Sequence, residues 1–175
     1  MPSTRPIFLQ RLFRASSDPR EELRPLWHRI VAITRQPEWY ADCGVADTVP
    51  GRFDMITAIL SLVVLRMENQ PHLQEASAHL IELFVQDMDG QLREFGINDV
   101  VVGKHMGRLM STLGGRMGAY RDALAAGDVE VMAKAVLRNI TLTDDAPAIR
   151  LADRLGGIAA SLHATADPDL LAGRV

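Results

Sequence analysis

The chain has too few cysteines, too little positive charge and too short an apolar run for several classes of protein. Cys43 is its only cysteine, which excludes an internal disulfide framework and a cysteine-rich zinc site and fits a reducing compartment. The net charge of -3 argues against sequence-specific binding of nucleic acid, which usually needs a basic surplus. The longest uncharged apolar run, residues 55–65, is shorter than the roughly 20 residues of a membrane span. We expect a buried core helix there instead.

The sequence also lacks the short motifs that position catalytic groups. It contains no Gly-x-Ser-x-Gly nucleophile elbow, no phosphate-binding loop and no Gly-x-Gly-x-x-Gly turn. We therefore expect a protein that is not an enzyme and that holds no cofactor and no metal.

Helix-favouring patterns separated by proline, glycine and capping residues fill most of the chain. No segment alternates apolar and polar residues over the length of a strand. Helix starts are indicated at Asp18-Pro19, Thr48-Val49-Pro50, Pro71 and Asp128, and helix ends at Gly44, Gly96 and Gly127. We expect an all-α fold, a single compact bundle of about six to seven helices. Residues 18–166 would form the helical domain, after an N-terminal segment (1–17) and before a frayed tail (167–175).

The segment from Asn98 to Gly127 combines two helical stripes. At about 100° per residue, its large apolar residues fall on one face and its small residues on another. The small residues are Gly103, Gly107, Ser111, Gly114 and Gly118, and three methionines run beside them, Met106, Met110 and Met117. A glycine inside a helix costs about 1 kcal/mol relative to alanine, so a close neighbour is expected to offset that cost. The neighbour is either another helix of this chain or an apolar helix of a partner, for which methionines supply an adaptable surface.

Arg52 and Asp54 bracket Phe53 at the start of the expected buried helix. Asp54 suits the positive end of the helix dipole, and Arg52 would pair with Asp87 on the next helix. Two interpretations are open, a structural salt bridge and a polar rim around a surface that binds a partner.

Two histidines and two glutamates, His72, Glu75, His79 and Glu82, fall on one helical face at a spacing that can ligate a metal. Their mean direction lies roughly 160° from that of the expected core face, so we interpret them as surface pairs. A helix-bundle metalloenzyme built on them is the least favoured alternative. A helical adaptor that dimerises through the small-residue face is another.

Residues 1–17 carry three arginines and no acidic residue. Arg5, Arg11 and Arg14 flank an apolar helical face made of Phe8, Leu9, Leu12 and Phe13. Such a basic amphipathic patch can lie on an anionic membrane surface. The equally favoured alternative is a disordered leader whose apolar residues dock on the domain.

Several segments, in matching order and spacing, resemble the ubiquinol–cytochrome c chaperone family. They are residues 36–48, 51–55, 84–89, 92–97, 102–104 and 116–120, and the resemblance covers residues 25–140. It implies an all-helical, non-enzymatic chaperone that binds newly made cytochrome b and assists assembly of ubiquinol–cytochrome c reductase. It also implies a cytoplasmic location, peripheral at the inner membrane, and a place in the vicinity of the ribosome.

The resemblance and the helical stripes together select candidate client-binding residues. They are Arg52, Asp54, Asp87, Arg93, Gly103, Lys104, Met106, Gly107, Met110, Gly114, Met117 and Gly118. Gly114 stands where relatives tend to carry an aromatic residue, which would widen a groove at that point.

Overall fold

The computed structural model describes residues 18–94 and 99–175, so the expected membrane patch at residues 1–17 lies outside it. The helices are α1 (Arg24–Thr34), α2 (Glu38–Ala41), α3 (Val49–Glu68), α4 (Gln74–Glu94), α5 (Asp99–Ala126), α6 (Val129–Asn139), α7 (Ala148–Ala164) and α8 (Asp167–Leu171), with short 3₁₀ turns at Pro19–Leu23 and Pro71–Leu73. Within these ranges the only β pairing is an isolated bridge between Val45 and Leu142. The all-α expectation is confirmed.

Helix starts lie where the capping residues and prolines of the sequence predict them. Side-chain oxygens of Asp18, Thr48 and Asp128 accept hydrogen bonds from backbone N–H groups two or three residues later, at 2.8 to 3.3 Å. α1 begins at Arg24, so Pro25 lies in the first turn, where the missing N–H costs no helical hydrogen bond.

α3 is the central helix of the bundle. It packs against α1, α4, α5 and α7, and every residue from 55 to 65 is buried except Ile56. The hydroxyls of Thr57 and Ser61 are satisfied inside the core by the carbonyls of Asp54 and Thr57, at 2.9 and 2.6 Å. The apolar run of the sequence is therefore a core helix. None of the helices in the described ranges has the length and hydropathy of a membrane span.

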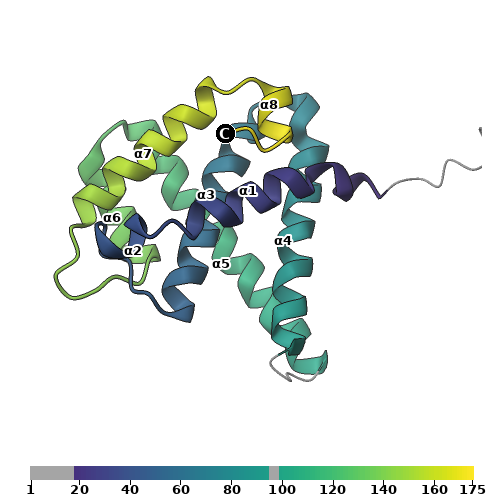
Figure 1. Cartoon of the computed structure of the whole chain (residues 1–175), viewed down its shortest axis with the longest axis horizontal. Coiled ribbons are helices and arrows are strands. Elements are labelled where there is room, and N and C mark those ends of the chain that lie inside the picture. The colour runs from purple at the N-terminus through teal and green to yellow at the C-terminus, as the bar shows by residue number, and fades with distance from the viewer. Residues whose placement is uncertain (1–17, 95–98) are drawn as a thin grey trace, which may run out of the picture.

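α4 and α5 form an antiparallel pair whose joined ends project beyond the rest of the molecule (Figure 1). The later part of α5 packs against α3 and α6, whereas α1 crosses α4 nearer its start. The angle between this projecting pair and the start of α3 leaves space for a surface hollow, described below.

The expected frayed tail after residue 167 is wrong. α8 forms there, and Leu170 is completely buried against the core. Gly173 has a φ of +70° and lies against the carbonyl of Pro25, and Arg29 Nε donates to the carbonyl oxygen of Val175 at 2.8 Å. These long-range contacts tie the C-terminal residues to α1.

An acid-sensitive clamp joins α8 to the end of α3 and to the 3₁₀ turn before α4. Asp167 accepts hydrogen bonds from His72 Nε2 and Arg66 Nη2, both at 2.7 Å, and these bonds lower the pKa of Asp167. A carboxyl whose pKa is lowered by folding stabilises the folded state above its ordinary pKa of about 4, and that contribution is lost as the pH falls through the lowered value.

We therefore expect hydrogen-exchange protection of α8, corrected for intrinsic rates, to fall when the pH is lowered from 5 toward 2. Asp167→Asn should reduce protection already at pH 6 and should remove most of this pH dependence. The matched control is Asp169→Asn, which breaks only a local pair with Arg174 on the same surface. Protection in the wild type that does not change with acid would show that the clamp contributes nothing.

Candidate functional site

A buried ion pair lies beneath the first turns of α3. Asp54 is 6% exposed, and its carboxylate accepts from Arg116 Nη2 at 2.5 Å and from the backbone N–H and hydroxyl of Thr141 at 2.8 and 2.6 Å. Arg116 also donates to the Thr57 hydroxyl. The network joins α3, α5 and the segment after α6, so one charged pair fixes the relative position of three parts of the chain.

The same network supports an aromatic surface on one side and a buried phenol on the other. The Arg116 guanidinium lies 5.6 Å from the ring centre of Phe53, a favourable cation–π distance. One turn further along α5, Tyr120 is 1% exposed, and no group in the described residues bonds its hydroxyl. Burial raises the pKa of Tyr120, so the phenol remains neutral.

Above this network lies a hollow of about 520 Å³ between the start of α3 and the projecting helix pair, which we call the groove. Its apolar surface is made of Val49, Pro50, Phe53 and Ile56 from α3, Met88 from α4 and Leu109 from α5. Val49 is 76% exposed, so a large apolar side chain faces solvent at the edge of the groove.

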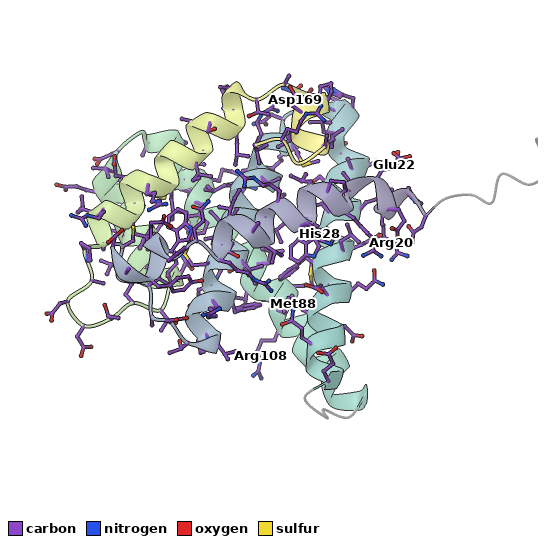
Figure 2. All side chains as sticks on the ribbon, in the orientation of Figure 1. Arg20, Glu22, His28, Met88, Arg108 and Asp169 are labelled. Atoms are coloured by element: carbon purple, nitrogen blue, oxygen red, sulfur yellow. The ribbon has the colours of Figure 1, made fainter. Side chains whose placement is uncertain are left out.

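The polar side chains of the groove are three hydroxyls, from Thr34, Tyr40 and Thr112, the amide of Gln91 and three guanidinium groups. The Tyr40 hydroxyl donates to the Thr34 carbonyl at 2.7 Å, and burial raises the pKa of Tyr40, so it stays a donor. The charged residues of the lining are three arginines, Arg35, Arg52 and Arg108, with no acidic residue among the described lining. Figure 2 shows Arg108 projecting from α5 on the same side of the molecule as Met88.

The side of α5 that faces away from the core is formed by small residues. Gly107, Ser111 and Gly114 are exposed and Gly118 is half-buried, and we call these four the glycine face. A Cβ built on any of the three glycines would meet no atom within 4 Å. The interpretation that these glycines are packed inside their own bundle is therefore wrong. At about 100° per residue, Gly115 falls between the glycine face and the groove edge of α5, so the two surfaces adjoin.

The comparisons with known proteins agree with the earlier resemblance. The family model of the ubiquinol–cytochrome c chaperones matches residues 41–175. The chain belongs to the ubiquinol–cytochrome c chaperone family. The match begins later than the resemblance did and continues to the last residue. The protein is therefore a chaperone and not an enzyme, as the resemblance implied.

A solved relative has the same fold. The crystal structure of the Cbp3 homolog from Brucella abortus is 33% identical to this chain, with a TM-score of 0.81 over 97% of this chain and 95% of that one. No curated protein matches the chain.

Two candidate client-binding residues near the start of α3 make contacts other than those predicted from the sequence. Arg52 does not pair with Asp87. Its Nε lies 2.7 Å from Asp47 Oδ1, and its guanidinium lies 5.5 Å from the ring centre of Tyr40, which places it on the groove rim. Asp54 is buried in the ion pair with Arg116, so the expectation that it contacts a partner is wrong. The predicted salt bridge between Arg52 and Asp87 is therefore wrong, and the buried ion pair of this segment is instead that of Asp54 with Arg116.

Other expected residues lie around the groove and the glycine face. Asp87 is exposed on α4 and lines a second hollow of about 820 Å³, which shares Arg35 and Gln91 with the groove. Met110 is 39% exposed beside the glycine face, whereas Met117 is half-buried against the core. Arg93 belongs to α4, and Gly103, Lys104 and Met106 belong to α5, but their side chains lie outside the described part of the structure.

The predicted histidine and glutamate face, on α4 and the 3₁₀ turn before it, lies on the surface. His72, Glu75 and Glu82 are exposed and His79 is half-buried, and His72 bonds Asp167. Within residues 18–94 and 99–175, no group of three or more His, Cys, Asp or Glu side chains is arranged to hold a metal ion.

Of the residues that line the groove, sequence reasoning selected only Arg52. Arg35, Ile56, Met88 and Arg108 come from four helices or their ends, and no local pattern relates them. Arg116 did carry a signal, because it lies between buried Leu113 and Tyr120 on the apolar face of α5, where an unpaired charge is costly.

Proposed function

We propose that this protein is a chaperone that binds newly made cytochrome b and holds it for assembly into ubiquinol–cytochrome c reductase. Family membership supports the assembly role. The observation that supports binding of an apolar client is the pair of adjoining surfaces, the groove and the glycine face, both open in the structure.

The two surfaces suit a transmembrane segment for complementary reasons. Exposed glycines let the backbone of a partner helix approach closely, which is how helices of membrane proteins often pack. The groove offers apolar side chains, among them Met88, that can adapt to several client side chains. A client helix on both surfaces would cover the exposed Val49. The protein would then act in the cytoplasm at the inner membrane, with residues 1–17 on the anionic surface, near the ribosome that makes the client.

We expect a photo-crosslinker at Arg108 or at Gly114 to capture cytochrome b in cells. The matched control is a crosslinker at Arg174, which is exposed beside Asp169, at the opposite end of the molecule in Figure 2. Deletion of the protein should lower the level of ubiquinol–cytochrome c reductase and leave other respiratory complexes unchanged.

Equal crosslinking from all three positions, or a normal level of the complex after deletion, would contradict the proposal. Crosslinks between two copies of this chain through Gly114 would instead favour the dimerising adaptor. In that case Gly107→Leu should convert a dimer to a monomer in light scattering.

A further inference from the structure

We propose that the groove selects apolar protein segments that carry an acidic side chain at their edge, and that Arg35 and Arg108 bind its carboxylate. The inference rests on the proposed function and adds a charge requirement to it. It follows from the chemistry of the rim, which is independent of the apolar surface beneath.

The rim is strongly biased in charge for an acidic protein. The chain has a net charge of -3, yet the described lining of the groove holds three arginines and no carboxylate. Arg52 is already partly neutralised, because it pairs with Asp47 at 2.7 Å. Arg35 and Arg108 are exposed, and neither has a carboxylate within ion-pair distance among the described residues. Two guanidinium groups without an ion pair among the described residues therefore flank an apolar surface, and Arg35 also borders the second hollow, which Asp87 and Glu94 line.

A carboxylate is the group that best satisfies this arrangement. Arginine presents a planar fork of donors that a carboxylate accepts in pairs, and a nearby lysine or arginine on the occupant would be repelled. The described lining between the arginines holds no other charged group, and its Tyr40 hydroxyl already donates to the Thr34 carbonyl. The occupant that fits is apolar along its length and acidic at its margin.

The surroundings favour a helix of a protein over a lipid as that occupant. The glycine face adjoins the groove along α5, and a Cβ at Gly114 or Gly115 would meet no atom within 4 Å. Such open backbone suits the ridge of another helix. A single acyl chain in the groove would leave that face bare.

The test compares two labelled peptides of about 15 residues, long enough to form a helix. Both share one alanine–leucine core and a neutral fluorophore, and they differ only in glutamate or lysine flanks. Wild-type protein at low salt should bind the glutamate peptide roughly tenfold more tightly. Arg35→Gln/Arg108→Gln should abolish this preference, and Arg35→Glu/Arg108→Glu should reverse it.

A control with the same change in net charge is Arg138→Gln/Arg174→Gln, on exposed residues outside the groove lining, which should keep the preference. Thermal melts confirm that each variant is folded. Equal binding of the two peptides, binding of neither, or a preference that survives Arg35→Gln/Arg108→Gln would overturn the inference.

Vesicles of phosphatidylglycerol separate the lipid from the protein occupant. The inference fails, and the groove is a lipid site, if these vesicles displace the glutamate peptide from the wild type but do not bind Arg35→Gln/Arg108→Gln. Loss of the charge preference with cytochrome b crosslinks intact overturns only the inference. A clear preference without those crosslinks overturns only the identity of the client.

Discussion

Replacing Arg116 with methionine is expected to lower the free energy of unfolding by about 3–5 kcal/mol. The substitution leaves the Asp54 carboxylate 6% exposed without its cation, and Thr141 alone cannot compensate the charge. Urea denaturation followed by far-UV circular dichroism measures the change directly.

Arg121→Met on the same helix is the matched control. Arg121 makes an ion pair with Glu68 at 2.8 Å, but both side chains are nearly half exposed, so its loss should cost no more than about 1 kcal/mol. Equal losses for the two variants would contradict the assignment of Arg116 as the buried anchor. The double variant Asp54→Leu/Arg116→Met should recover part of the stability, because no unpaired charge is then left in the core.

The second large effect is that replacing different glycines with alanine should change the free energy of unfolding in opposite directions. Gly114→Ala and Gly118→Ala should each raise the free energy of unfolding by up to about 1 kcal/mol, since the added methyl meets no atom and alanine favours the helix. Gly51→Ala should instead lower it by about 3 kcal/mol or more, because the new Cβ would lie 2.0 Å from the carbonyl oxygen of Ala46. Urea melts of the three variants give the comparison.

The glycine face carries a further, functional expectation. Gly114→Leu should leave the fold intact, yet it should lower cytochrome b crosslinking from Arg108 several-fold, because the side chain occupies the path of the client backbone. The control is Gly127→Asn, which lies at the end of α5 with a φ of +62° that asparagine tolerates. Full crosslinking by Gly114→Leu would show that the client does not use this face, and destabilisation by Gly114→Ala would show that the face is covered.

On the proposed function, these glycines would lower the stability of the helix in exchange for close approach of the client backbone. No neighbour within the described chain offsets their helical cost, so the packing of this fold does not require glycine at these positions. Residue spacing alone does not distinguish a glycine stripe that is packed against a neighbour from one that is exposed. Spacing places residues on one face of a helix, but it does not say what lies opposite that face.

The groove could not be predicted for the same reason. Its apolar residues belong to three consecutive helices, α3, α4 and α5, and no local pattern shows which of their side chains meet around one hollow. Phe53 and Ile56 sit at the edge of a helix that is apolar nearly all round, so periodicity cannot separate the groove residues from the buried ones. The predicted pair of Arg52 with Asp87 was wrong because it rested on the order of the helices in the sequence, which does not place two side chains within contact of each other.

The sequence by itself determined the helices, their caps, the central position of residues 55–65 and the family. These properties depend on local residue spacing, on proline and capping chemistry and on motifs that can be recognised in the sequence alone. Only the tertiary structure decided which arginine neutralises Asp54, that residues 167–171 pack as a helix, and that the glycine face and the arginine-rimmed groove are open. Those outcomes depend on how helices distant in the chain meet, and pairing, burial and exposure across such contacts are set by three-dimensional packing.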